Sequence, residues 1–114
     1  MSGVEVFLNS NGALTGTGQS LVASYPYGLD AGDVDGDGDV DLVVGNQASY
    51  PNQVLFNNGS GTFTESGQSL GGEATNDVVL GDIDLDGDLD LVAINEGHGG
   101  RGYVVYDNDG SGSF

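Results

Sequence analysis

Two stretches of the sequence share one pattern: DVDGDGDVDLVVGN at residues 33–46 and DIDLDGDLDLVAIN at residues 82–95. Each begins with five aspartates at alternate positions of nine and continues into a short β-branched run. Carboxylates this close together repel one another unless a cation neutralises them. Gly38 and Gly87, at the sixth position of each stretch, permit a sharp turn that lets alternate carboxylates converge on one point. The pattern therefore predicts two cation-binding loops, each leading into a strand.

The ligand types favour calcium. Ca²⁺ takes about six to eight oxygen ligands in irregular geometry, Mg²⁺ demands a stricter octahedron, and zinc would be expected to recruit His or Cys. We expect two Ca²⁺ per chain. The predicted side-chain ligands are Asp33, Asp35, Asp37 and Asp41 in the first loop and Asp82, Asp84, Asp86 and Asp90 in the second. We expect Asp39 and Asp88 to ligate through their backbone carbonyls, with their side chains pointing outward.

An EF-hand begins similarly but requires a Glu at position 12 and flanking helices. Position 12 is Val44 in the first loop and Ala93 in the second, and both flanks are β-like. The loops are therefore not EF-hands.

The aspartate loops belong to a repeat of about 49 residues. GQSL occurs at 18–21 and 67–70, and the loops start at 33 and 82. A third element occurs three times: VFLNSNGAL at 6–14, VLFNNGSGTF at 54–63 and VVYDNDGSGSF at 104–114. Each unit contains four short β-like runs separated by turn residues, with no useful helical period. An all-β fold of four-stranded β-propeller blades is predicted.

The chain holds about two blades plus extra strands. Residues 1–26 are expected to supply strands three and four of a partial blade. Residues 27–70 form the first full blade, and residues 71–114 form a second whose last strand is incomplete. Propellers typically have about four to eight blades. Either the chain is a piece of a longer one, or several copies close a ring; two isolated blades would expose apolar faces and open edges, which favours homo-oligomerisation.

The loops, the apolar strands after them and the NNGSGTF turn resemble the FG-GAP/VCBS repeat of integrin-α-like propellers. The resemblance implies that the calcium loop joins strands one and two of a blade. It also implies an extracellular or secreted location, although the N-terminal MSGVEVFLNS does not read as a signal peptide. The first turn departs from the pattern, because NSNGALT at 9–15 lacks the second Gly and the Phe.

Composition limits the function further. The chain has 18 acidic residues, a single basic residue at Arg101, no Cys and a formal charge of −17. We therefore expect no nucleic-acid partner, no disulfide and no thiolate site, and we find no apolar run long enough for membrane insertion. We also expect no enzymatic activity, because nothing in the sequence fixes a nucleophile near His98.

A ligand-binding role is the alternative to a purely structural scaffold. The resemblance places the loops between strands two and three, and between blades, on a ligand face. These loops carry Tyr25, Tyr27, Tyr50, His98 and Arg101 as candidate contacts. Tyrosines with polar neighbours suit a carbohydrate or protein ligand of an adhesin module.

Overall fold

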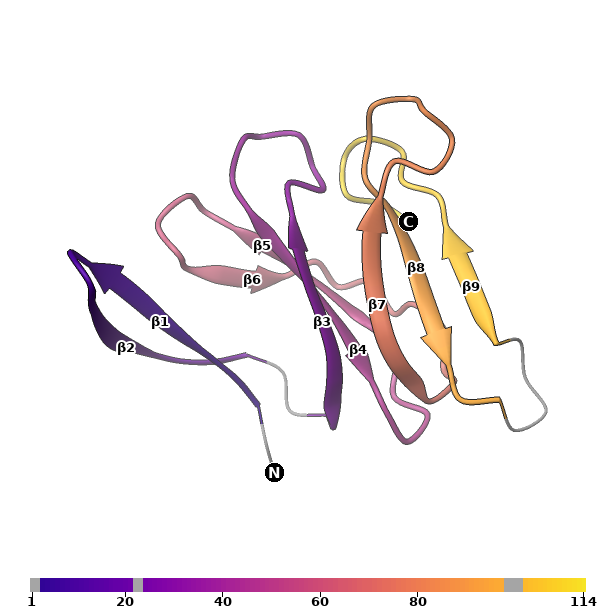
Figure 1. The fold of residues 1–114 in the computed structure, drawn as a ribbon, viewed down its shortest axis with the longest axis horizontal. Helices are drawn as coiled ribbons and strands as arrows, with labels where there is room; N and C mark the ends of the chain where they lie inside the picture. The colour runs from indigo at the N-terminus through magenta and orange to yellow at the C-terminus, as the bar shows by residue number, and fades with distance from the viewer. Residues whose placement is uncertain (1–2, 22–23, 98–101) are drawn as a thin grey trace.

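The computed structural model describes residues 3–21, 24–97 and 102–114. These residues form nine strands and no helix, and so no helix that could cross a membrane (Figure 1). The strands are β1 (Val4–Ser10), β2 (Ala13–Leu21), β3 (Pro26–Gly32), β4 (Asp41–Asn46), β5 (Gln53–Asn57), β6 (Phe63–Glu65), β7 (Thr75–Gly81), β8 (Asp90–Asn95) and β9 (Tyr103–Tyr106).

The strands pair as antiparallel neighbours in three sheets that stand side by side in Figure 1. The first sheet is β1–β2, the second is β3–β4–β5–β6, and the third is β7–β8–β9. The all-β prediction is confirmed. The four-stranded unit is complete in the second sheet, and the described residues form a row of sheets without a closed ring, so closure stays a prediction.

Both faces of β4 are buried, which explains its uninterrupted apolar run. Successive side chains of a strand point to opposite faces. Val43 belongs to the core between the second and third sheets, together with Leu91 and Ala93. Val44 belongs to the core between the first and second sheets, together with Leu21. The second sheet is therefore held between two neighbours.

The third sheet has one covered face and one exposed face. Two cross-strand rows occupy equivalent positions: Asp30, Val43 and Val54 in the second sheet, and Val79, Val92 and Val105 in the third. Val43 and Val54 are fully buried by the neighbouring sheet, whereas Val79 and Val105 are 45% and 48% exposed. The described residues leave the outer face of the third sheet uncovered.

Each GQSL segment joins one sheet to the next. Gln19 Nε2 donates to the Gly61 carbonyl (2.7 Å), and Gln19 Oε1 accepts from the Phe63 amide (2.9 Å). Gln68 makes the same pair of bonds to the final turn of the chain (2.6 and 2.9 Å). A primary amide can donate and accept at once, so Gln suits this position and recurs with the repeat.

The close approach of β3 and β7 depends on Gly28. A Cβ at this position would lie 2.7 Å from Asp77 Cα and 3.0 Å from Val78 N, both backbone atoms. We expect Gly28→Ala to lower the free energy of unfolding by about 1–3 kcal/mol, because the two strands must separate. Urea denaturation measures this, with Gly72→Ala as the control because nothing lies within 4 Å of its Cβ. Equal effects of the two substitutions would contradict the account.

Candidate metal centres

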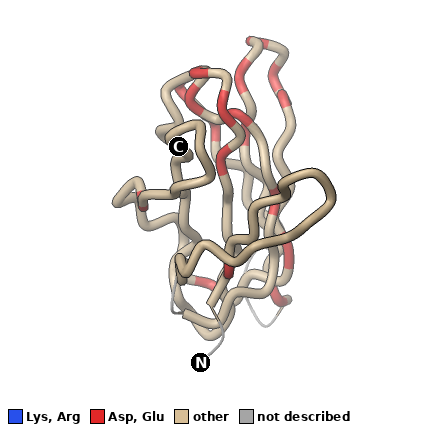
Figure 2. The backbone as a smooth tube through the Cα atoms, turned by 90° about the vertical axis from the view of Figure 1, so that its left-hand side faces the viewer, with Lys and Arg blue, Asp and Glu red and all other residues tan. Residues whose placement is uncertain are grey.

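The two aspartate loops occupy the same place in their sheets. Residues 33–40 join β3 to β4, and residues 82–89 join β7 to β8, so each loop connects the first and second strands of a sheet. Gly38 and Gly87 have φ of 93° and 102°, the left-handed region that the sequence pattern anticipates for a sharp turn. Figure 2 shows acidic residues gathered at this end of the molecule.

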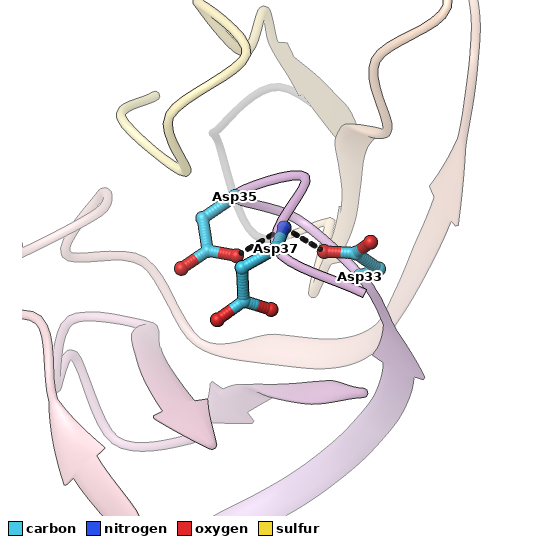
Figure 3. Close-up of side chains that lie close together, drawn as sticks. All are labelled: Asp33, Asp35 and Asp37. Atoms are coloured by element: carbon cyan, nitrogen blue, oxygen red, sulfur yellow. Dashed lines mark hydrogen bonds between the residues drawn. The ribbon is translucent and has the colours of Figure 1, made fainter. Parts of the chain in front are cut away.

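In the first loop, Asp33, Asp35 and Asp37 converge (Figure 3). Each offers one carboxylate oxygen, and these three oxygens lie within 4.8 Å of one another. The loop backbone supports the arrangement. Asp33 Oδ1 accepts from the Gly36 amide (2.8 Å) and the Asp37 amide (3.1 Å), and Asp33 Oδ2 accepts from the Gly38 amide (2.9 Å). The turn itself therefore gathers the carboxylates.

The second loop repeats this cluster with Asp82, Asp84 and Asp86, whose contributing oxygens also lie within 4.8 Å of one another. Asp82 Oδ2 accepts from the Gly87 amide at 3.1 Å. Asp82 Oδ1 is buried and has no hydrogen-bond partner in the described part of the chain. A buried anionic oxygen without a partner is costly, and a hard cation would satisfy it. The oxygen-only donor set therefore fits Ca²⁺.

The ninth aspartate of each loop is buried and binds backbone amides. Asp41 Oδ2 accepts from the Val34 amide (3.0 Å), and Asp41 Oδ1 accepts from the Asn57 amide (2.8 Å). Asp90 makes the equivalent pair of bonds (both 2.9 Å). Asp41 is not grouped with Asp33, Asp35 and Asp37 in the first cluster. These residues thus tie each loop to the turn after the third strand, a role that the sequence analysis missed.

Asp39 and Asp88 do not point into open solvent. Both are half-buried. A Cβ on Gly59 would lie 2.7 Å from an Asp39 carboxylate oxygen, and a Cβ on Gly110 would lie 2.5 Å from an Asp88 carboxylate oxygen. Each side chain instead rests against the glycine turn of its own repeat, where a larger residue would clash, and ligation through the backbone carbonyls stays a prediction.

Asp107 is a carboxylate at the second loop that has no counterpart at the first. Its oxygen lies within 4.8 Å of ligand oxygens of Asp84 and Asp90. The register places Tyr106 opposite Leu91 and Leu55 opposite Leu42, so Phe56 occupies the position of Asp107 in the second sheet. The sequence analysis did not single out Asp107, because it lies outside the aspartate loop, 23 residues from Asp84 and 17 residues from Asp90.

The family of the chain follows from a family-model comparison. The model described as the FG-GAP-like repeat matches residues 33–93, more than half of the chain, from the first aspartate loop into β8. The chain belongs to the FG-GAP-like repeat family. In comparisons with curated proteins and with solved structures, it matches none.

In this FG-GAP-like chain, the carboxylates fall into two electrostatic groups. The pKa values of Asp35, Asp88 and Asp107 are raised, chiefly by desolvation and further by neighbouring carboxylates. The pKa of Asp90 is lowered, chiefly by hydrogen bonds from backbone amides. The pKa of Asp109 is lowered, chiefly by its hydrogen bond from the Ser111 side chain.

These shifts predict a stability maximum in acid for the calcium-free protein. As the pH falls from neutral toward 3.8, Asp35, Asp88 and Asp107 take up protons more readily in the folded state, so folding stability rises. Below 3.8, stability falls, because Asp90 and Asp109 bind protons more readily in the unfolded state. Melting temperatures measured against pH in calcium-free buffer check this, and a steady decline from pH 7 would contradict it.

Three candidate ligand residues of this FG-GAP-like chain, Tyr25, Tyr27 and Tyr50, lie at the end of the sheets opposite the aspartate loops. Tyr25 and Tyr50 stack, with ring centroids 5.8 Å apart. Tyr25 and Tyr27 line an open hollow of about 610 Å³ between the second and third sheets. Tyr50 contacts Tyr25 without lining the hollow itself. His98 and Arg101 lie outside the described residues.

Proposed function

We propose that the chain is a calcium-binding β-propeller repeat module with a structural, self-assembling role. The observation that carries the proposal is the repeated convergence of three aspartates at two equivalent loops. In the second loop, the buried Asp82 Oδ1 has no hydrogen-bond partner among the residues that the structure describes. Bound Ca²⁺ would cancel repulsion within each loop and fix the connection between the first two strands of its sheet. We propose an extracellular setting, as the family implies, where sites with dissociation constants of about 10⁻⁴–10⁻³ M would be filled.

Calorimetric titration with Ca²⁺ tests the proposed sites. We expect two sites per chain, and weaker binding of Mg²⁺ because it demands stricter geometry. Asp37→Asn should abolish the first site by removing a convergent carboxylate. Asp39→Asn is the matched control, because its backbone carbonyl is retained. Titration heats no larger than the heats of dilution would count against these sites. An equal loss of Ca²⁺ binding in Asp37→Asn and Asp39→Asn would also count against them.

The proposed assembly rests on uncovered apolar faces at both ends of the row of sheets. The third sheet exposes Val79 and Val105, and the first sheet exposes Phe7 (54%) and Leu14 (68%). A ring of identical copies would cover both faces. Light scattering in millimolar Ca²⁺ should give a discrete oligomer, and chelation should dissociate or unfold it. A calcium-saturated monomer would contradict self-assembly.

Ligand binding is the second candidate function, and the hollow beside Tyr25 and Tyr27 favours it. We propose a binding role and not a catalytic one. The sole His and the sole Arg, at positions 98 and 101, lie in the glycine-rich stretch EGHGGRG, which is poorly suited to holding a catalytic group in one geometry.

A further inference from the structure

The hollow lies between two sheets, at the end opposite the aspartate loops. One side is formed by the start of β3 and the segment after β4, and the other by the start of β7 and the end of β8. Its volume of about 610 Å³ is within the range of small-molecule sites. A protein partner would instead need roughly 800 Å² of surface on each side. The concave shape therefore favours a small, ring-sized ligand.

One wall of the hollow is aromatic and internally braced. The Tyr25 ring stacks on Tyr50 at an interplanar angle of 21°. The Gln47 amide donates to the Tyr25 carbonyl (3.0 Å), and the Tyr50 amide donates to the Gln47 carbonyl (3.2 Å). Tyr25, Ala48 and Ser49 have positive φ, a conformation that persists in non-glycine residues only where the surroundings fix it. The wall is therefore held in place before any ligand arrives.

Two amides span the gap between the sheets. Gln47 Nε2 donates to Asn76 Oδ1, which joins the second sheet to the third. This bond leaves Gln47 Oε1 as an acceptor and Asn76 Nδ2 as a donor, because each primary amide carries both functions. Adjacent acceptor and donor groups match neighbouring hydroxyls of a ligand. Glu96 also lines the hollow and adds a carboxylate.

A buried acceptor lies beside the hollow. Asn46 is fully buried, and its Oδ1 has no hydrogen-bond partner among the described residues. The equivalent Asn95 Oδ1 accepts from the Thr75 hydroxyl at 2.9 Å. In the second sheet, Pro26 takes the place of Thr75 opposite the asparagine, and Pro26 lines the hollow. The second sheet therefore lacks the hydroxyl that the third sheet supplies to its asparagine, although Asn46 itself is buried and does not line the hollow.

The charge of the chain indicates which class of ligand the hollow would bind. The formal charge is −17, and the single basic residue of the sequence lies outside the described residues. None of the described residues that line the hollow is basic, and Glu96 is acidic. Phosphates, sulfates and acidic sugars would meet repulsion without a cationic partner. An uncharged ligand rich in hydroxyls meets no such penalty.

From the braced tyrosine wall, the amide pair and the strong negative charge of the chain, we propose that this hollow binds a neutral sugar ring. The apolar face of the ring packs on the tyrosines, and its hydroxyls meet Gln47 and Asn76. This inference rests on the second candidate function and specifies its ligand class. It adds Gln47, Asn76 and Glu96 to the site, none of which the sequence analysis identified.

The test is a titration of the ¹⁵N-labelled full chain, in millimolar Ca²⁺, with methyl glycosides of neutral hexoses and N-acetylhexosamines. Glucuronic acid and N-acetylneuraminic acid serve as anionic probes. At least one neutral glycoside should shift the side-chain amides of Gln47 and Asn76, saturating with a millimolar dissociation constant. The acids should cause no saturating shift. No response to any neutral glycoside, or an equal response to the acids, would overturn the proposal.

Two tyrosine variants sharpen the test. Tyr27→Ala removes a 72% exposed ring that lines the hollow, and should weaken glycoside binding about tenfold. Tyr103→Ala removes a 68% exposed ring on β9, outside the hollow, and should leave the affinity unchanged. Equal effects would overturn the assignment. The melting temperatures of the same samples with and without Ca²⁺ test the calcium proposal separately. The calcium proposal and the sugar proposal can therefore fail independently.

Discussion

Asp41→Ala is expected to lower the free energy of unfolding by about 3–5 kcal/mol, because two backbone amides lose a buried charged acceptor. Asp41 is 0% exposed, and its two oxygens hold the amides of Val34 and Asn57. The loss of one side chain therefore detaches the first loop from the turn after β5. Chemical denaturation in calcium-free buffer measures this effect apart from any contribution of metal binding.

Asp39→Ala is the control for this substitution. Asp39 belongs to the same loop, and its half-buried carboxylate accepts none of the side-chain hydrogen bonds found for Asp41. Its removal should change stability by less than about 1 kcal/mol. If Asp41→Ala were no more damaging than Asp39→Ala, the proposed role of the buried aspartate would be wrong.

Removal of Ca²⁺ is expected to produce the second large effect. In about 10 mM Ca²⁺, a site with a dissociation constant of about 10⁻⁴ M stabilises the native state by about 2.7 kcal/mol, so two sites contribute about 5 kcal/mol. For a domain of this size, that corresponds to a fall in melting temperature on the order of 20 °C or more on chelation. Circular dichroism melts with and without a chelator measure it.

Magnesium replacement is the matched control for chelation. Mg²⁺ carries the same charge and screens the 18 acidic residues equally well, but demands stricter geometry. If Ca²⁺ restores the melting temperature of the chelated protein and Mg²⁺ does not, the stabilisation comes from binding at specific sites. Equal restoration by both ions would indicate general screening of the negative charge and contradict the loop sites.

The repeated elements of the fold could be read from the sequence. The alternating aspartates with a glycine at position six indicated a turn, and the following apolar runs indicated strands with buried faces. Val43 and Val44 show why this succeeds: an uninterrupted apolar run fits a strand that is covered on both sides. Because the repeat spacing is 49 residues, the same prediction of a turn followed by a buried strand applied to the second loop and to β8.

Contacts between distant segments could not be read in the same way. Gln47 and Asn76 are 29 residues apart and meet only because the second and third sheets stand side by side. Asp107 reaches Asp84 and Asp90 only after β9 pairs with β8. Repeat spacing identifies equivalent positions but does not give the packing between sheets, which determines these contacts.

The buried position of Asp41 and Asp90 was also unpredictable from composition. A fifth carboxylate in an acidic loop reads as one more ligand or as a solvated charge. Its burial follows from the closing of the loop against the turn after the third strand, where the Asn57 and Asn108 amides need acceptors. The turn sequence and the loop sequence thus act as one unit.

The most direct test of the account follows the backbone amide resonances of the full chain during addition of Ca²⁺. We predict shifts confined to residues 33–41 and 82–90 and to the turns that Asp41 and Asp90 contact, which saturate at millimolar Ca²⁺. Gradual shifts spread across exposed acidic residues elsewhere, such as Glu5 and Glu65, without saturation would contradict the central claim that each loop holds one calcium ion.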